Sequence, residues 1–388
     1  MIGRVITMKA TGIICEYNPF HNGHLYHLNK VKEMFKDDVV VLVMSGHFMQ
    51  RGETSIINKW DKTKLALEHG IDLVIELPFY FATGSADIFG FGAIKLLDSL
   101  NVSNLVFGSE GNNIDNIKKL ANIQNSENYN KSVKKLMKEG FNYPTATSKA
   151  LLEFDEESIN SPNDILGLSY IKAIKELKSN IKPHTIKRTS DYHDLKTEND
   201  VVSASFIRNK LIKNENINRY VPAKTLKYLK ELTFTENLFP FLKYKILTSI
   251  NNLEIYHEVN ENIAGRIKKF ILKSTSYDEL IKNIKSKKDT YNKISRILTY
   301  ILCDFKKEDA SKINEIEYIR VLGFSEKGRQ YLNSIKENVE LPIVTNFGDV
   351  KNKALDFEIK VTSVYASKLN EKDKKTLIEK EFKTPPIR

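Results

Sequence analysis

The fold of this chain is decided by residues 12–27, which read GIICEYNPFHNGHLYH. An apolar run ends at Cys15, a short turn follows, and apolar residues then recur with helical spacing. A strand that turns directly into a helix makes an anion site, because the first backbone N–H groups of the helix lack intrahelical partners. Gly23 lets a phosphate approach the backbone, and His21 and His24 add side-chain donors. The segment therefore predicts a phosphate-binding turn.

Similar apolar runs recur through the first 110 residues. They are short, unbroken and rich in β-branched residues, as in parallel strands buried on both faces, and they cover residues 10–15, 39–44, 71–77 and 104–107. Stretches with helical spacing separate them, at residues 25–35, 59–67 and 86–97. We expect a doubly wound α/β fold with a parallel sheet and a final strand near residues 185–188. Ligands of such folds bind beyond the carboxyl ends of the strands.

The chain of 388 residues exceeds what one hydrophobic core usually organises, so we expect two domains, residues 1–220 and residues 221–388. Helical patterns prevail after this boundary, at residues 226–232, 241–250, 263–272 and 294–305. Alternating apolar and polar residues predict a small strand element near the end, from residues 342–345 and 357–364. The second domain is thus predicted to be mainly helical.

The net charge of +11 is concentrated in the second predicted domain. Residues 1–220 hold 28 Lys and Arg against 26 Asp and Glu, whereas residues 221–388 hold 32 against 23. A near-neutral first domain and a basic second domain suggest chemistry in one and polyanion binding in the other. The candidate polyanion-binding residues are Arg266, Lys268, Lys269, Lys285, Lys287, Lys288 and Arg296. We interpret Lys59, Lys62 and Lys64 as the solvated face of an amphipathic helix.

Composition argues against several classes of protein. No run approaches the roughly 18 consecutive apolar residues of a membrane span, and the first ten residues lack the apolar core of a signal peptide. We therefore expect a cytoplasmic protein. Cys15 and Cys303 lie far apart without metal-ligand spacing, and we identify no metal site made of side chains. Residues 1–7 precede Met8, and we interpret them as a tail or a misplaced start.

A second phosphate-binding element follows the last predicted strand. Ser203 and Ser205 carry hydroxyls that can cap a helix, and Arg208 carries a guanidinium that can reach phosphates. Together with His21 and His24, these residues resemble the signature of the nucleotidyltransferase superfamily of HxGH type. The resemblance implies a HUP/Rossmann-like fold in which both histidines bind ATP phosphates and stabilise the transition state. Catalysis of this kind is positioning and electrostatics rather than proton transfer.

The complete sequence of the first motif is similar to that of a narrower family, the bacterial tRNA(Met) cytidine acetate ligases. The similar residues are Glu16, Tyr17, Asn18, Pro19, Phe20, His21, Asn22, Gly23, His24, Leu25, Tyr26 and His27. Further matches span nearly the whole chain, at residues 44–46, 50–52, 107–110, 161–164, 192–194 and 320–324. Residue 47 and residues 189–191 depart from the family pattern. The resemblance also places Ile14, Cys15, Gly108, Asn163 and Arg188 at the nucleotide.

The resemblance implies an enzyme that uses ATP to activate acetate as acetyl-adenylate, with release of pyrophosphate. The acetyl group then passes to N4 of the wobble cytidine of elongator tRNA(Met). Acetate is ionised at pH 7 and attacks the α-phosphorus without a general base, while Mg²⁺ helps pyrophosphate to leave. Two alternatives stay open. One is a nucleotidyltransferase acting on a small phosphorylated metabolite, and the other is a non-catalytic RNA-binding protein with a vestigial nucleotide fold.

Overall fold

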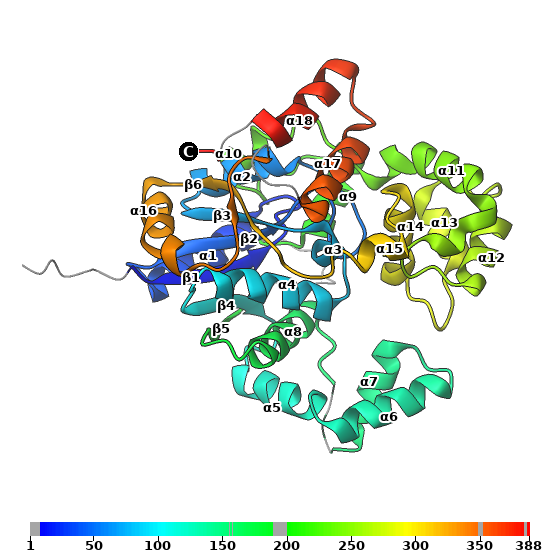
Figure 1. Ribbon diagram of the computed structural model, residues 1–388, viewed down its shortest axis with the longest axis horizontal. Coiled ribbons are helices and arrows are strands. Elements are labelled where there is room, and N and C mark those ends of the chain that lie inside the picture. The colour runs from blue at the N-terminus through cyan, green and yellow to red at the C-terminus, as the bar shows by residue number, and fades with distance from the viewer. Residues whose placement is uncertain (1–7, 155, 157, 189–199, 348–351, 384–385) are drawn as a thin grey trace, which may run out of the picture.

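A seven-stranded sheet runs through the centre of the molecule, in the order β5-β4-β1-β2-β3-β6-β7 (Figure 1). The computed structural model describes the chain except for residues 1–7, 155, 157, 189–199, 348–351 and 384–385. The expected tail at residues 1–7, the family match at 192–194 and the departure at 189–191 lie outside the described residues. The strands are β1 (Ala10–Cys15), β2 (Val39–Ser45), β3 (Leu73–Leu77), β4 (Asn104–Ser109), β5 (Lys182–Lys187), β6 (Ile319–Phe324) and β7 (Ile343–Val344).

Strands β1 to β5 pair in parallel, β6 runs antiparallel to β3, and β7 pairs in parallel with β6. The central strands are apolar on both faces: β2 reads VVVLVMS, and every residue of it is buried. Chain order along the sheet reverses at β1, which lies between β2 and β4. The carboxyl ends of β1 and β4 therefore flank a topological switch point, where open α/β sheets bind ligands.

Helices cover both faces of the sheet. On one face, α1 (Asn22–Met34) and α2 (Lys59–Glu68) pack through Leu28, Val31 and Trp60. On the other face lie α4 (Ala86–Ser99), α8 (Pro162–Glu176) and α16 (Glu326–Ile335), and the short α3 (Phe79–Ala82) leads from β3 into α4. The predicted doubly wound α/β fold is confirmed.

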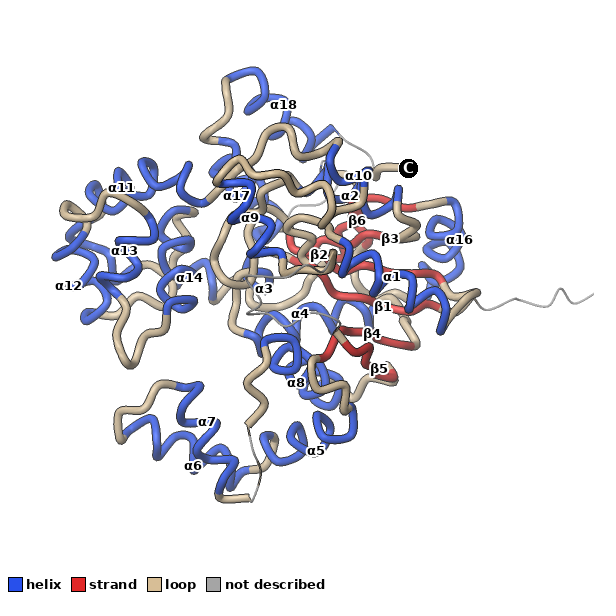
Figure 2. The backbone as a smooth tube through the Cα atoms, turned by 180° about the vertical axis from the view of Figure 1, so that it is seen from behind, coloured by secondary structure: helices blue, strands red, loops and turns tan. Residues whose placement is uncertain are grey.

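Three helices between β4 and α8 form an arm. Helix α5 (Ile114–Gln124) packs against α8, and α6 (Glu127–Lys138) and α7 (Tyr143–Leu152) form an antiparallel pair beyond it. Figures 1 and 2 both show α6 and α7 standing away from the sheet, on the side of the molecule where α12 and α14 lie. We call α6, α7 and the turn between them the arm hairpin.

The chain after β5 is mostly helical. Helices α9 (Ala204–Ile212) and α10 (Ala223–Leu226) lead to a helical unit made of α11 (Phe239–Thr248), α12 (Glu261–Phe270), α13 (Tyr277–Ile284), α14 (Tyr291–Leu302) and the short α15 (Lys307–Ala310), with 3₁₀ turns at Thr235–Leu238 and Ile250–Ile255. The helices predicted at residues 241–250, 263–272 and 294–305 are confirmed. The helix predicted at 226–232 is wrong, because α10 ends at Leu226. Tertiary contacts hold the backbone that follows; for example, Lys368 donates a hydrogen bond to the Leu232 carbonyl.

The last part of the chain returns to the sheet. Strands β6 and β7 extend it, with a 3₁₀ turn at Lys336–Asn338 between them, and α17 (Lys353–Ala366) and α18 (Glu371–Lys383) follow. The strand at residues 342–345 is confirmed as β7, but residues 357–364 lie in α17. The alternation of apolar and polar residues there does not mark a strand. Helix α17 is buried on several sides, and its neighbouring residues Val361 and Thr362 both lie in the interior. The division into domains 1–220 and 221–388 stays a prediction.

No described helix combines the length and the apolar composition needed to cross a bilayer.

Candidate active site

A cavity of about 1080 Å³ opens at the carboxyl ends of β1, β4 and β5. It brings together sixteen of the residues predicted to bind nucleotide: Ile14, Cys15, Glu16, Tyr17, Asn18, His21, Gly23, His24, Tyr26, His27, Gly108, Asn163, Arg188, Ser203, Ser205 and Arg208. Pro19, Phe20, Asn22 and Leu25 do not line it. The same cavity extends to the arm hairpin and to the N-terminal end of α14.

The β1–α1 turn is held in shape by its own side chains. Tyr17 has a left-handed backbone (φ 50°), and the Asn18-Pro19 peptide bond is cis. The buried Asn18 amide donates to the Thr54 carbonyl at 3.2 Å and accepts from the Ile56 backbone N–H at 2.8 Å. The turn is thereby attached to the loop that follows β2. Pro19 and Phe20 are buried, and the Phe20 ring packs against Tyr17 and His24, with centroids 4.8 and 5.7 Å apart.

His21 is the N-cap of helix α1, directly before its first residue. The Nδ1 atom of His21 accepts from the Gly23 backbone N–H at 3.0 Å, and Nδ1 of His24 accepts from the His21 N–H at 3.3 Å. A neutral imidazole that accepts through Nδ1 carries its proton on Nε2. The two rings stack with centroids 3.8 Å apart. The geometry therefore presents two neighbouring Nε2–H donors at a helix N-terminus.

Both of these imidazoles are neutral in the free protein. Burial lowers the pKa of His21 to about 3, assisted by the nearby positive charges of Arg188 and Arg208. Burial, together with His21 and Arg188, also lowers the pKa of His24 well below its ordinary value. Burial lowers the pKa of His27 to about 4, against a hydrogen bond to the Val106 backbone that raises it. The positive charges of Arg188 and Arg208 therefore lie near the two histidines in the free protein.

Asn22 has a structural role that its place in the motif did not indicate. Its side-chain amide donates to the carbonyls of Asp200 and Arg219, at 3.0 and 2.8 Å, and its backbone N–H donates to Tyr220. These bonds attach the start of α1 to the segments on both sides of α9. Asn22 thus aligns the two predicted phosphate-binding elements without lining the cavity.

The ends of β4 and β5 supply a polar group of residues. Gly108 faces Arg188, since a Cβ at Gly108 would lie 3.3 Å from Arg188 Cγ. Asn163 donates to Glu110 at 2.6 Å, and the same carboxylate oxygen lies 3.7 Å from Arg188 Nε. The buried Arg188 Nε has no hydrogen-bond partner among the described residues. Glu110 therefore positions both Asn163 and Arg188, a role that the sequence motifs did not predict.

The second predicted element caps α9 and aims Arg208 at the turn. Ser203 is the N-cap of α9 and accepts from the Phe206 N–H at 3.2 Å. Arg208 donates to the Asn18 carbonyl at 2.9 Å, to Glu53 at 2.7 Å and to Ser205 at 3.3 Å. Its guanidinium is thus oriented at the cavity in advance by Glu53, another residue that the sequence motifs missed.

Lys59 and Lys62 are buried, so their interpretation as a solvated helix face is wrong; Lys64 is exposed as expected. Lys62 Nζ donates to the Ser45 carbonyl at 2.8 Å and to the Glu16 carbonyl at 3.1 Å, at the ends of β2 and β1. Burial lowers the pKa of Lys62 to about 7, although Glu16 opposes the shift. Helical spacing alone did not reveal this, because the partners of these amines lie outside α2: Lys62 binds the ends of two strands, and Lys59 pairs with Glu76 and Glu381.

The candidate polyanion-binding residues divide into three groups. Lys288 and Arg296 line the cavity, and Lys285, Lys287 and Lys269 are exposed. Arg266 is occupied by an ion pair with Asp289, and Lys268 lies 3.7 Å from Glu254. Among the described residues, no group of three or more His, Cys, Asp or Glu side chains is arranged to hold a metal ion.

Comparisons with known proteins agree with this arrangement. A family model described as HIGH nucleotidyl transferase matches residues 8–380. The tRNA(Met) cytidine acetate ligase of Anoxybacillus flavithermus is 39% identical, with 98% of this chain and 100% of the relative covered. That of Clostridium novyi is 40% identical, covering 98% and 99%. The crystal structure of Thermotoga maritima TmcAL bound with alpha-thio ATP matches with a TM-score of 0.89 and 32% identity, covering 98% and 99%. The chain therefore belongs to the HIGH nucleotidyl transferase family and, within it, to the tRNA(Met) cytidine acetate ligases.

Proposed function

We propose that this protein uses ATP to convert acetate into acetyl-adenylate and then transfers the acetyl group to N4 of the wobble cytidine of elongator tRNA(Met), with release of AMP. The observation that carries the first step is the stacked pair His21 and His24, which offers two Nε2–H donors at the N-terminus of α1. The ATP analogue in the related Thermotoga maritima structure supports the same assignment.

The proposed chemistry requires charge stabilisation and positioning more than proton transfer. The acetate carboxylate attacks the α-phosphorus, the bond to the β-phosphate oxygen breaks, and pyrophosphate leaves with the electron pair. His21 and His24 donate to phosphate oxygens, and Arg188 and Arg208 neutralise the charge that develops. Mg²⁺ enters as part of the MgATP complex that the reaction consumes. Acetate is already ionised, so neutral imidazoles with depressed pKa values suit this role.

The second step requires the RNA base to reach the adenylate. The cavity that holds the histidines continues to Lys288 and Arg296, two of the candidate residues for RNA binding. A polyanion bound there would place an unpaired loop base at the open end of the cavity. ATP and tRNA as substrates suit a cytoplasmic location. The basic residues 221–388 are the part of the chain to which we assign tRNA affinity.

The first step is tested by exchange of labelled pyrophosphate into ATP. We expect exchange that depends on acetate, and we expect His24→Ala to abolish it while tRNA binding stays within about twofold. Absence of exchange in the wild-type protein would reject the proposed activation of acetate. Loss of both exchange and tRNA binding in His24→Ala would show that His24 is structural.

The second step is tested with ATP, labelled acetate and total tRNA from cells that lack this protein. We expect label in N4-acetylcytidine after digestion to nucleosides. Exchange without label in tRNA would favour a nucleotidyltransferase that acts on a small phosphorylated metabolite. Binding of tRNA without exchange would favour a non-catalytic RNA-binding protein.

A further inference from the structure

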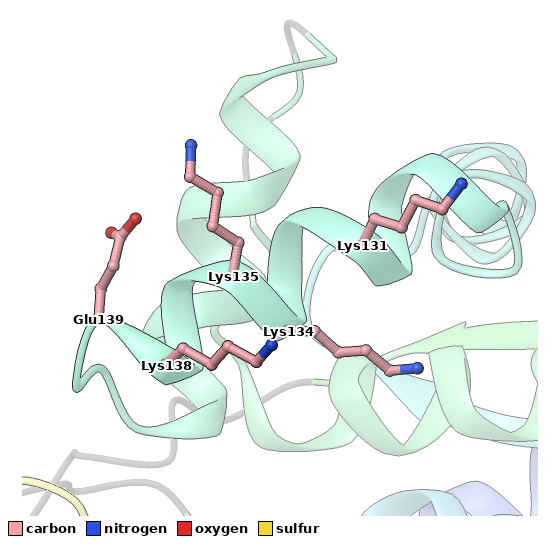
Figure 3. A pocket seen from close by; sticks show the side chains of 5 residues that line it. All are labelled: Lys131, Lys134, Lys135, Lys138 and Glu139. Atoms are coloured by element: carbon pink, nitrogen blue, oxygen red, sulfur yellow. The ribbon is translucent and has the colours of Figure 1, made fainter.

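Four lysines give the arm hairpin a strongly basic surface, although residues 1–220 are nearly neutral overall. Lys131, Lys134, Lys135 and Lys138 follow one another at helical spacing along α6, and all four are exposed. Figure 3 shows their side chains projecting from α6 in several directions. Lys131 pairs with Glu127 at 2.7 Å, whereas the described residues provide no ion pair for the other three. We call Lys134, Lys135 and Lys138 the arm lysines.

Apolar side chains are exposed beside the arm lysines. Met137, Phe141 and Tyr143 are 45%, 37% and 49% exposed, and all three line the cavity that contains His21 and His24. The Tyr143 hydroxyl donates to Asp87 at 3.4 Å, and Lys149 Nζ lies 4.9 Å from the centre of the Phe141 ring. Partly exposed aromatic rings next to basic side chains are what proteins use to stack and hold unpaired bases.

The arm hairpin touches the basic helical unit across the cavity. Asn142 donates to the Lys287 carbonyl at 2.7 Å, and a Cβ at Gly140 would lie 3.7 Å from Lys288 Cε. The turn that follows the arm lysines thus contacts the segment that carries Lys285, Lys287 and Lys288, although the two basic segments come from separate parts of the chain. A polyanion that spans both segments is attracted by the positive charge of each.

We propose that the arm hairpin is the second wall of the RNA site, facing α14. The arm lysines bind phosphates of the anticodon loop, and Phe141 and Tyr143 stack on unpaired bases next to the cytidine that enters the cavity. This inference rests on the proposed function for the identity of the RNA. It adds a contact surface from the first half of the chain, which the charge distribution along the sequence did not predict.

The lysine contacts are tested with the variant Lys134→Gln/Lys135→Gln/Lys138→Gln and the anticodon stem-loop of tRNA(Met) as probe. The control variant Lys372→Gln/Lys375→Gln/Lys383→Gln removes the same charge from α18, which carries none of the candidate polyanion-binding residues and lies at the opposite end of the molecule (Figure 1). We expect the arm variant to bind the RNA at least tenfold more weakly at 100 mM salt. The slope of log Kd against log salt should fall by about 2, since each lost contact with single-stranded RNA removes about 0.7. The control should stay within twofold of wild type.

Acetate-dependent pyrophosphate exchange separates this inference from the proposed function. We expect the arm variant to exchange as fast as wild type, because none of the arm lysines lines the ATP cavity. Unchanged RNA binding in the arm variant would overturn the proposal, whatever the exchange assay shows. Absent exchange in wild type would reject acetate activation, while the binding measurements would still decide the role of the arm lysines.

Stacking is tested at Tyr143. With 2-aminopurine next to the wobble position, we expect wild type and Tyr143→Phe to quench its fluorescence on binding, and Tyr143→Ala to lose the quenching and about tenfold in affinity. A raised KM for ATP in Tyr143→Ala with normal RNA binding would show that the ring holds the nucleotide instead, and would overturn the proposal.

Discussion

The ammonium group of Lys59 lies 2.8 Å from a carboxylate oxygen of Glu381, and neither side chain is exposed to solvent. Lys59 also pairs with Glu76 of β3 at 2.8 Å, and Arg320 of β6 lies 3.6 Å from Glu381. Burial, followed by the charge of Glu76, raises the pKa of the neighbouring Glu358 to about 8, so that carboxyl is neutral at pH 7. The positive charges of Lys59 and Arg320 then balance the negative charges of Glu76 and Glu381 in the interior. Because Glu381 belongs to α18, these ion pairs attach α18 to the centre of the nucleotide-binding fold.

Glu381→Gln should lower the free energy of unfolding by about 3–5 kcal/mol, because it leaves the positive charges of Lys59 and Arg320 in the interior against the single negative charge of Glu76. Urea denaturation followed by circular dichroism measures the change. Glu379→Gln is the matched control, because Glu379 lies on the same helix with a side chain that is 40% exposed. We expect less than about 1 kcal/mol there. Equal effects of the two substitutions would contradict a balanced buried cluster.

The signals that could be read from the sequence are local ones. The β1–α1 turn, the parallel strands and the cap at Ser203 all depend on residues close together in the chain, and the structure has them where they were predicted. The burial of Lys59 depends on Glu381, more than three hundred residues later, and no periodicity within α2 contains that information. The roles of Glu53 and Glu110 were not predicted for the same reason, since each acts on an arginine in a distant segment.

Because of Lys62, the free energy of unfolding should depend on pH in the alkaline range. Its pKa is about 7 in the folded protein and 10.5 ordinarily, so between these values the unfolded chain binds a proton that the folded chain does not. Stability contributed through this group therefore rises as pH increases from 7 to about 10 and is constant below 7. Urea unfolding of wild type and Lys62→Met at several pH values measures the difference.

The exposed Lys64 on the same helix provides the control for this experiment. Lys64→Met should shift stability by a small amount that does not change with pH. A difference between wild type and Lys62→Met that stays flat from pH 7 to 10 would mean that the buried amine keeps its proton. Its two carbonyl partners would then outweigh the cost of burial.

Histidine NMR should show imidazoles that remain neutral in mildly acidic solution. With ¹⁵N-labelled histidine and no ATP, His21, His24 and His27 are expected to stay unprotonated at pH 5.5, with the proton of His21 and His24 on Nε2. Addition of ATP should raise their pKa values, because phosphate charge favours the imidazolium. The urea-unfolded chain, with histidines titrating near 6.5, serves as reference. Titration of His21 near 6.5 in the folded protein would contradict its burial.

Gly23→Ala tests the turn without removing a polar group. A Cβ at Gly23 would lie 2.9 Å from Cε1 and 3.0 Å from Nδ1 of His21, so the ring must move away from the N–H that it caps. We expect ATP binding, measured by calorimetry, to weaken at least tenfold. The free energy of unfolding should fall by about 1 kcal/mol, the usual cost of losing an N-cap.

Gly265→Ala is the matched substitution, since a Cβ at Gly265 meets nothing within 4 Å in the middle of α12. There alanine should leave ATP binding unchanged and raise stability by up to about 1 kcal/mol through its higher helix propensity. Normal ATP affinity in Gly23→Ala would show that the phosphates do not depend on the position of the His21 ring. In that case Arg188 and Arg208 would be the main phosphate ligands, and the pair of histidines would serve chiefly to begin α1.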